Sequence, residues 1–326
     1  MYNTPYHEHI NLSEHSFLVT GGAGFIGSNI VEYLLKYGAG KVRILDNFST
    51  GFKKNIEAFL SHPALEMIEG DIRNYDTCKE ALNEIDFVSH QAALGSVPRS
   101  VKDPVATNSV NIDGFLNMLN AAKDKPVKRF VYASSSSIYG NDPSLPKQEG
   151  NIGEALSPYA VTKNVNEQYA NVFSKVYGFH TIGLRYFNVF GPKQSPAGPY
   201  AAVIPLFIEA ALQKRAPFMY GDGETSRDFT FIENAVQANI KAMLLSNIDK
   251  HEAMNIACGE RTSLNELWAK IRALTGGNIN PEYREERKGD VRHSLADISK
   301  AKKLIGYEPQ WSIINGLRIT LDWYKE

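Results

Sequence analysis

The chain has 326 residues, of which 43% are hydrophobic and 22% are charged, ordinary values for a globular protein with a packed core. At roughly 100–200 residues per domain, this length suits one large or two modest domains. The 35 Lys and Arg nearly balance the 36 Asp and Glu, for a formal net charge of −1. Proteins that bind nucleic acid or a membrane surface through bulk charge usually carry a basic excess, so we expect neither partner.

Cysteine usage and the N-terminal residues favour a cytoplasmic protein. Cys78 and Cys258 are the only cysteines; they lack metal-ligand spacing and cannot form a disulfide framework, so no metal site is predicted. Residues 1–16 are polar and lack the basic-then-apolar pattern of a signal peptide. No run of about 18 uncharged apolar residues occurs, so we expect no membrane-spanning helix.

The first half of the chain alternates strand-like and helix-like segments. Short apolar runs predict strands at 17–20, 42–45, 65–68, 87–88 and 130–133. Helical spacing of apolar residues is clearest at 25–36, 108–123 and 159–176. This alternation predicts a doubly wound parallel sheet covered by helices, with a ligand crevice at the carboxyl ends of the strands.

Beyond about Arg185 the pattern loosens. Residues 191–200 are rich in Pro and Gly, which predicts a loop. Further helices are predicted near 201–213, 232–245, 263–274 and 313–324. We expect two domains: a sheet domain of residues 1–187 plus about 226–258, and a smaller α/β domain of 188–225 plus about 259–326.

A glycine loop follows the first predicted strand. Gly21, Gly24 and Gly27 have the spacing Gly-x-x-Gly-x-x-Gly, which lets the backbone approach a pyrophosphate at a helix N-terminus. With 25 glycines in the chain, chance predicts about 0.15 such spacings, so a plain strand–helix turn is the competing interpretation. Asp46 ends the second strand, where a carboxylate accepts from ribose hydroxyls and favours NAD over NADP. Asp71 follows the third strand, as an adenine contact or a turn residue.

Tyr159 and Lys163 lie four residues apart on a predicted helix. The chain holds three Tyr-x-x-x-Lys spacings where chance predicts about one, so the spacing alone decides nothing. Only this pair follows the strand that ends in the serines 134–137. A tyrosine pKa of about 10 is too high for a base at neutral pH, but a nearby ammonium lowers it. The competing interpretation is a surface contact beside a flexible serine loop.

Together these motifs resemble the extended short-chain dehydrogenase/reductase family, which has a Rossmann fold. The matching segments are 20–27, 46–47, 108–114, 134–140, 159–163 and 185–192. Within that family the chain resembles the bacterial UDP-N-acetylglucosamine/UDP-N-acetylgalactosamine 4-epimerases of O-antigen and Vi-antigen synthesis. The stretches that carry this likeness are 90–100, 221–228 and 287–297.

The resemblance implies roles for individual residues. Tyr159 would take the proton of the sugar 4-hydroxyl, Lys163 would hold the nicotinamide ribose, and Ser135 would bridge the 4-oxygen. The implied NAD-binding residues are Gly21, Gly24, Phe25, Ile26, Gly27, Asp46, Asn47, Ser49, Gly51, Asp71, Ile72, Gln91, Ala92, Ala93, Asn111, Ser134, Tyr159, Lys163, Tyr186 and Val189. The implied substrate-binding residues are Ser96, Ser135, Ser136, Tyr159, Asn188, Ala202, Val203, Tyr220, Arg227, Arg287, Asp290 and Ser294.

The resemblance also implies a reaction: interconversion of UDP-GlcNAc and UDP-GalNAc through a transient 4-keto sugar with bound NAD. Sugar 4,6-dehydratases carry Thr-Asp-Glu where this chain has serines 135–137, and decarboxylases carry a glutamate at Ser137, so both activities are disfavoured. A small Ser294 leaves room for an N-acetyl group.

Alternatives stay open at this point. The sugar could be an N-acetylhexosaminuronic acid whose carboxylate pairs with Arg99, or another UDP-sugar. Two further alternatives are a ketoreductase, which would consume NAD(P)H in each turnover, and a non-catalytic NAD-binding protein. Relatives form homodimers through a four-helix bundle, so the resemblance implies one here, although the helices at 108–123 and 159–176 show only apolar residues that a core would also need.

Overall fold

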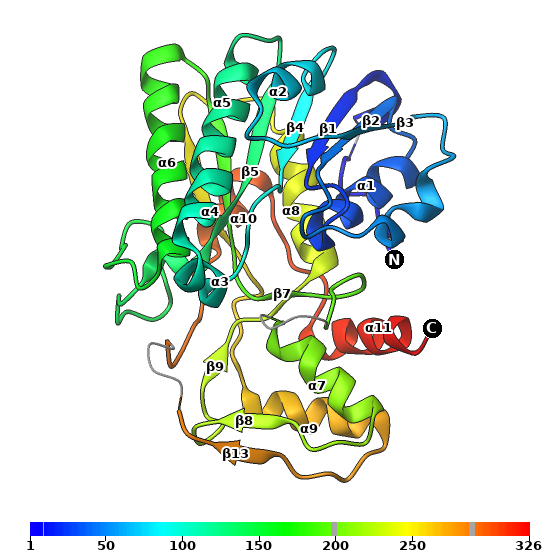
Figure 1. The fold of residues 1–326 in the computed structure, drawn as a ribbon, viewed down its shortest axis with the longest axis vertical. Helices are drawn as coiled ribbons and strands as arrows, with labels where there is room; N and C mark the ends of the chain where they lie inside the picture. Colours follow the sequence, from blue (N-terminus) through cyan, green and yellow to red (C-terminus); the bar gives the residue numbers. More distant parts are fainter. Residues whose placement is uncertain (9, 197–200, 287–290) are drawn as a thin grey trace.

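The computed structural model describes residues 1–8, 10–196, 201–286 and 291–326. Its centre is a seven-stranded parallel sheet with the order β11-β6-β5-β4-β1-β2-β3 (Figure 1). The strands are β1 (Ser16–Thr20), β2 (Lys41–Asp46), β3 (Leu65–Glu69), β4 (Phe87–His90), β5 (Arg129–Ser135), β6 (Thr181–Tyr186) and β11 (Glu252–Ile256). The predicted doubly wound α/β architecture is confirmed, and all five strands predicted from apolar runs are present.

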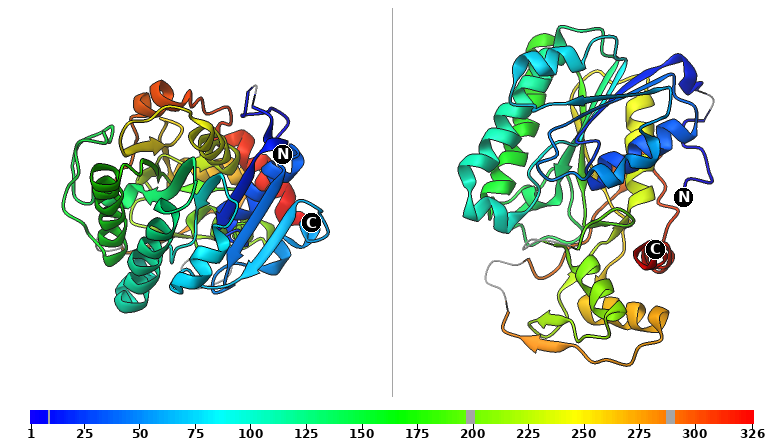
Figure 2. Two further views of the ribbon diagram at one scale, coloured as in Figure 1. Left: turned by 90° about the horizontal axis from the view of Figure 1, so that it is seen from above. Right: turned by 45° about the vertical axis from the view of Figure 1, so that its right-hand side comes forward.

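Helices cover both faces of the sheet (Figure 2). One face carries α1 (Phe25–Lys36) and α8 (Ile232–Leu244), and the other carries α2 (Tyr75–Ala81), α5 (Phe115–Lys123) and α6 (Pro158–Tyr177). Successive residues of β1 divide between the two layers because side chains alternate along a strand. Val19 packs with the residues of α1 and α8, whereas Leu18 packs with those of α2, α5 and α6.

The segment predicted as one helix over 108–123 is interrupted. It consists of α4 (Pro104–Asn108), a π-helical turn (Ser109–Gly114) and α5. Asn111 in that turn is buried, and its amide bonds Leu94 on one side and Thr162 of α6 on the other. Such wider turns are rare within helices and recur near functional sites. Here the turn faces the neighbouring helix and the segment that follows β4.

A smaller lobe lies at the carboxyl ends of the strands, and we call it the cap (Figure 1). Its helices are α7 (Val203–Leu212), α9 (Leu264–Thr275) and α11 (Ile313–Lys325). Its strands are β8 (Phe218–Tyr220), β9 (Ser226–Arg227), β12 (Thr262–Ser263) and β13 (Glu282–Arg284), with β7 (Val189–Phe190) and β10 (Thr230–Phe231) at the junction. Helix α10 (Ser299–Ile305) packs on β11 and α8 instead. The remaining elements are α3 (Val97–Lys102) and 3-10 turns at Leu12–Glu14, Lys53–Asn55, Glu57–Phe59 and Ser136–Tyr139.

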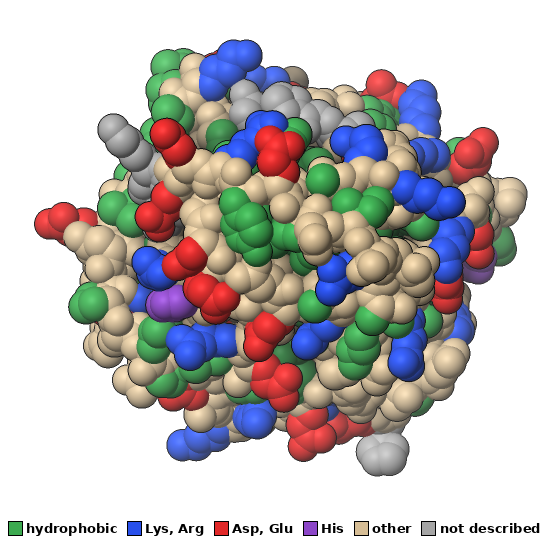
Figure 3. Space-filling model, turned by 90° about the horizontal axis from the view of Figure 1, so that it is seen from below, with side chains coloured by type: hydrophobic (Ala, Val, Ile, Leu, Met, Phe, Trp, Pro, Cys, Tyr) green, Lys and Arg blue, Asp and Glu red, His purple; other side chains and the backbone are tan. Residues whose placement is uncertain are grey.

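The surface at the cap end mixes charges of both signs with scattered apolar side chains (Figure 3). Within the described ranges, no helix has the length and apolar character needed to cross a bilayer, and no cluster of three or more potential metal ligands occurs. Both cysteines are free thiols.

Asp228, just before β10, fastens the cap to the sheet. Its side chain is fully buried and accepts backbone N–H bonds from Cys258 at 2.9 Å and Gly259 at 3.0 Å, both directly after β11. A third N–H, from Ala296, lies 3.3 Å away. Burial raises the pKa of this carboxyl to about 7, against the opposing effect of the backbone donors.

This raised pKa predicts a pH-dependent contribution to stability. The folded chain holds the Asp228 proton more tightly than the unfolded chain, so the contribution is complete below about pH 4 and declines as the pH rises towards about 7. Urea unfolding of wild type and Asp228→Asn between pH 4 and 8 measures it. We expect the difference in unfolding free energy between the two proteins to shrink with rising pH across that window. A constant difference would contradict the raised pKa.

Candidate active site

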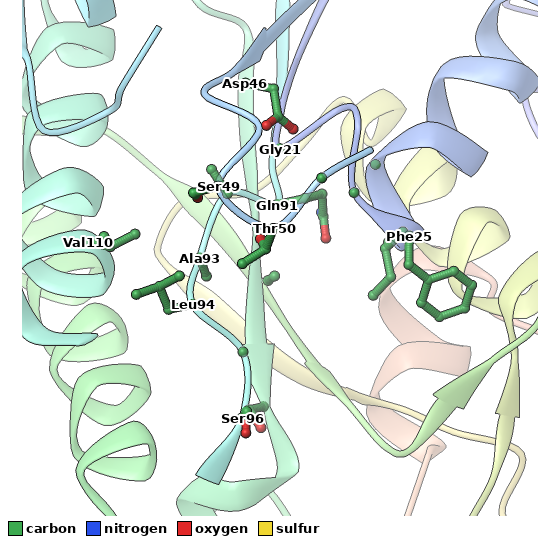
Figure 4. Close-up of a pocket in the computed structure, with 18 of the residues that line it drawn as sticks. Gly21, Phe25, Asp46, Ser49, Thr50, Gln91, Ala93, Leu94, Ser96 and Val110 are labelled. Carbon is green, nitrogen blue, oxygen red and sulfur yellow. The ribbon is translucent and has the colours of Figure 1, made fainter. Parts of the chain in front are cut away.

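A cavity of about 620 Å³ opens at the carboxyl ends of the strands. It runs from Asp46, at the end of β2, to Ser96, at the start of α3 (Figure 4). Gly21 and Gln91 border it between those ends. The predicted crevice is therefore present as a cavity lined by the glycine loop, the segment after β4 and the serines at the end of β5.

The glycine loop is built by close backbone approach. Gly21 has a φ of +67°, and a Cβ there would lie 2.8 Å from the backbone nitrogen of Ala92 after β4. A Cβ on Gly27 would lie 2.2 Å from the Gly21 carbonyl oxygen. No side chain fits at either position, so the loop folds tightly and leaves the N-terminus of α1 facing the cavity. The first N–H groups of a helix lack partners within it and favour an anion there.

Asp46 braces this loop from β2. Its carboxylate accepts from the N–H of Ala23 at 2.9 Å and from that of Phe48 at 2.8 Å. Burial raises the pKa of Asp46 although both backbone bonds favour the charged form. Each carboxylate oxygen has further lone pairs, so hydroxyl donors can also bind here.

Asp71 lies at the same end of the cavity in a charged pair. Arg73 donates from Nε to Oδ1 at 3.0 Å and from Nη2 to Oδ2 at 2.6 Å, and Asn47 donates to Oδ2 at 2.8 Å. The hydrogen bonds from Arg73 hold the pKa of Asp71 at about 2. Asp71 is thus ionised and lines the cavity, with both oxygens already engaged.

Tyr159 and Lys163 project from the first turns of α6 into the cavity. The helix begins there because Ser157 accepts a hydrogen bond from the N–H of Ala160 at 3.1 Å and Pro158 occupies the first position. The Lys163 ammonium lies 5.9 Å from the centre of the Tyr159 ring and donates to the Ala133 carbonyl at 2.7 Å. Burial lowers the pKa of Lys163 to about 8, while the charge of Glu167 opposes that change.

The serines at the end of β5 face in different directions. Ser135 lies near the Tyr159 hydroxyl and lowers the tyrosine pKa, although burial raises it more. Ser135 also accepts from the N–H of Ser137 at 3.1 Å and from its hydroxyl at 2.9 Å. Ser134 donates to Glu167, two turns further along α6, at 2.5 Å. Of these serines, Ser135 is the one that acts on the pKa of Tyr159.

A second cavity of about 330 Å³ lies between α7, β8 and α9. Asn188 and Ala201 line both cavities, so the two adjoin. Asn188 has a φ of +38°, and its amide donates to the Asp228 carbonyl at 3.0 Å. An extended ligand could therefore run from the sheet edge into the cap past this residue.

The structure gathers most of the predicted site residues around these cavities. Those that line the first cavity are Gly21, Gly24, Phe25, Ile26, Gly27, Asp46, Asn47, Ser49, Gly51, Asp71, Ile72, Gln91, Ala92, Ala93, Ser96, Ser134, Ser135, Tyr159, Lys163, Tyr186, Asn188, Val189 and Ala202. Those that line the second are Asn188, Val203, Tyr220 and Arg227. Asn111, Ser136 and Ser294 are not among the lining residues. Arg287 and Asp290 lie outside the described residues.

Some lining residues were not predicted. Gln194 and Ser195 reach the first cavity from the loop after β7, which no sequence periodicity marks. Phe218 lines the second cavity, and the guanidinium carbon of Arg284 lies 3.2 Å from the centre of its ring. A signal for Phe218 existed, because it stands two residues before Tyr220 and thus on the same face of a short strand.

Comparison with known proteins gives consistent similarities. The model of a family described as the NAD dependent epimerase/dehydratase family matches residues 17–257. The chain is 37% identical over 311 residues to a protein of Methanocaldococcus jannaschii described as a putative UDP-glucose 4-epimerase. That match covers 94% of this chain and 98% of the relative.

Solved structures show the same likeness. A UDP-N-acetylglucosamine 4-epimerase from Methanobrevibacter ruminantium, in complex with UDP-N-acetylmuramic acid, superposes with a TM-score of 0.91 at 39% identity, over 95% of this chain and 98% of that one. A UDP-glucuronic acid 4-epimerase from Bacillus cereus, in complex with UDP-glucuronic acid and NAD, superposes with a TM-score of 0.88 at 31% identity, over 95% and 99% of the two chains.

The position of Asp46 predicts how the cavity discriminates between dinucleotides. Asp46→Asn removes the charge that repels a 2′-phosphate and disturbs one of the two backbone bonds to the loop. We expect weaker NAD binding and a ratio of NADP to NAD affinity at least about tenfold higher than in wild type. Calorimetric titration of each dinucleotide into both proteins measures that ratio. An unchanged ratio would show that Asp46 does not select the cofactor.

Proposed function

The chain belongs to the NAD dependent epimerase/dehydratase family, among its UDP-sugar 4-epimerases, and from that premise we propose that it interconverts UDP-GlcNAc and UDP-GalNAc. The observation that carries the proposal is the contact between Ser135 and Tyr159, with Lys163 beside them, at the end of a cavity that begins at a glycine loop. Serines at 135–137 supply no carboxylate for dehydration.

The residues present fit NAD. Gly21 and Gly27 form a backbone cradle that a Cβ would fill, and the N-terminus of α1 faces a pyrophosphate held there. Asp46 would hold ribose hydroxyls, and Asp71 and Asn47 would border the adenine. When bound, NAD supplies a hydride acceptor that returns the same hydride, so no second redox substrate is needed.

The side chains around the sugar would take up and return the proton of its 4-hydroxyl. We assign Tyr159 as the base for the 4-hydroxyl and Ser135 as the hydroxyl that orients the 4-oxygen. Burial raises the pKa of the Tyr159 phenol, and Ser135 lowers it. We assign to the Lys163 ammonium, 5.9 Å from the ring centre, the further role of favouring the phenolate. Asn111 holds the backbone of Leu94 on the cavity wall and would act indirectly.

The second cavity would take the UDP moiety. Tyr220, Val203 and Arg227 line it, and a guanidinium suits a diphosphate. We assign Arg287 and Asp290 to the same ligand, from sequence alone. On this assignment the sheet lobe binds NAD, the cap binds the nucleotide sugar, and Asn188 lies where the two meet.

The N-acetyl group is the finer part of the proposal, and Ser294 supports it. This half-buried residue donates its N–H to the Ser226 carbonyl at 3.0 Å, directly before Arg227. Ser294 lines neither cavity, and we propose that its small side chain leaves room for the N-acetyl group of a bound sugar. The related structure that carries UDP-N-acetylmuramic acid holds an N-acetylated sugar, which agrees with this assignment.

A carboxylated sugar is the second candidate. Arg99 and Ser96 line the first cavity at its α3 end. A guanidinium there suits a sugar carboxylate. Assays of UDP-GlcNAc and its uronic-acid form side by side separate the two candidates.

We also propose a homodimer: of the two helices that the resemblance implies, α6 carries exposed apolar side chains, and α3 and α4 beside it carry others. Val101, Val105, Val172 and Val176 are between 49% and 77% exposed on these three helices, which contact one another. Exposed apolar side chains such as these favour burial against a second copy. A monomeric mass in sedimentation equilibrium would contradict this assignment.

Replacing the base tests the chemistry. Tyr159→Phe removes the hydroxyl and keeps the ring, so we expect kcat for UDP-GlcNAc to fall at least about a hundredfold while NAD stays bound. Turnover by product chromatography and the mass of released cofactor measure the two properties. Wild-type kcat in this variant would refute the assigned base.

Enlarging position 294 tests the substrate. Ser294→Tyr fills the space proposed for the N-acetyl group, so turnover of UDP-GlcNAc should be lost while that of UDP-glucose is kept. Ser294→Ala is the matched control and should keep both activities. Unchanged UDP-GlcNAc turnover in the tyrosine variant would rule out position 294 as the gate.

A further inference from the structure

A buried ion pair joins α6 to β6 behind the candidate active site. The side chains of Glu167 and Arg185 belong to residues only 8% and 3% exposed. The guanidinium donates from Nε to Oε1 at 3.0 Å and from Nη2 to Oε2 at 2.7 Å. Removing two charges from water offsets most of the attraction between them, so such a pair is weak evidence for a stabilising role. Its position points to another role.

The same carboxylate reaches the strand that carries the catalytic serine. Ser134 donates to Glu167 Oε1 at 2.5 Å, and one helical turn earlier Lys163 donates to the Ala133 carbonyl at 2.7 Å. Two side chains on one face of α6 thus hold two consecutive residues of β5. Ser135 is the next residue, so these contacts set its distance from Tyr159 on the same helix.

The far side of the guanidinium is also engaged. Arg185 donates from Nη1 to the Tyr139 hydroxyl at 2.9 Å and to the Glu149 carbonyl at 3.0 Å. Tyr139 in turn donates to Asn255 of β11 at 2.6 Å. With the guanidinium held on both sides, Glu167 is fixed in one orientation.

Glu167 also acts on the charge of Lys163. Burial lowers the pKa of Lys163 to about 8, and the negative charge of Glu167 raises it. His90 on β4 also faces this lysine but is neutral, because burial lowers its pKa to about 3. Tyr159, on the same helix, is a neutral phenol before it loses its proton.

The other titratable neighbours of the carboxylate are uncharged near neutral pH. Burial raises the pKa of Tyr132 well above its ordinary value and lowers the pKa of His251. Arg185 is therefore the charged group that faces Glu167 from β6. The pKa of Lys163 is therefore set by burial, which lowers it, and by the charge of Glu167, which raises it.

We infer that Glu167 is a positioning residue for the proton-transfer centre: it holds the end of β5 against α6 and keeps Lys163 in its ammonium form. The inference rests on the proposed roles of Tyr159 and Lys163. A merely structural pair would tie α6 to β6 and leave the titration of Lys163 unchanged.

The pH dependence of kcat distinguishes these roles. In Glu167→Gln the amide keeps the size of the side chain and removes the charge, so Lys163 loses its proton at lower pH. We expect the alkaline limb of the kcat profile for UDP-GlcNAc to move down by about one pH unit, and kcat at pH 8 to fall by about fivefold. KM should stay within about twofold because no group that contacts the sugar is changed.

Three further variants separate charge from folding. Glu32→Gln breaks another partly buried pair, with Lys193 at 2.7 Å, and should leave the alkaline limb in place. Glu167→Asp keeps the negative charge, so the alkaline limb of its kcat profile should lie at the wild-type pH. If E167Q does not fold, the double variant E167Q/R185M leaves neither charge unpaired and still removes the carboxylate.

The titration of Lys163 provides a readout that needs no turnover. Lysines labelled with ¹³C at the Cε methylene are titrated by NMR, with the Lys163 signal assigned by its loss in K163R. A lower midpoint in E167Q or the double variant, and an unchanged midpoint in E32Q, is the expected result. Equal midpoints in all of them overturn the inference. A wild-type protein that turns over no UDP-sugar refutes the proposed function instead, and the midpoints still decide the role of Glu167.

Discussion

All seven strands of the central sheet run in the same direction, and the candidate chemistry of this chain depends on that constraint. Each strand must be reached by a crossover, so the carboxyl ends gather at one edge and the helices at the faces. Asp46, Gln91 and Ser135 are distant in sequence but stand at the ends of, or just beyond, β2, β4 and β5. The cavity is the space that these ends enclose with the first turns of α1 and α6.

Residues at this edge serve the fold and the site together. The glycine loop exists because Gly21 and Gly27 let backbone meet backbone, and the same closeness leaves room for a ligand. Asp46 holds the loop through Ala23 while presenting its remaining lone pairs to the cavity. Lys163 is fixed by the Ala133 carbonyl on the strand beside it. The geometry offered to a ligand is therefore maintained by contacts that the folded chain makes in any case.

The sequence predicted the parts that depend on local pattern. Apolar runs located five strands, and the glycine spacing located the loop against which the first cavity forms. It did not predict β6 and β11, because Gly183, Arg185 and Asn255 interrupt their apolar runs. The π-helical turn at Ser109–Gly114 was also missed, since it depends on tertiary contacts of Asn111. The pairing of Glu167 with Arg185 joins residues 18 apart across the two elements, and no sequence spacing specifies such a contact.

Asn188 and Ala201 form a shared wall between the two cavities. A wall shared by two sites cannot be adjusted for one occupant without changing the shape offered to the other. The binding free energies of the two ligands are then not independent: whatever factor the first ligand applies to the affinity for the second, the second applies to the first. Asn188 has a left-handed backbone, and its side-chain amide donates to the carbonyl of Asp228. If the two cavities hold a cofactor and a nucleotide as proposed, reciprocal coupling between them follows from how the lobes are joined and needs no movement of one lobe against the other.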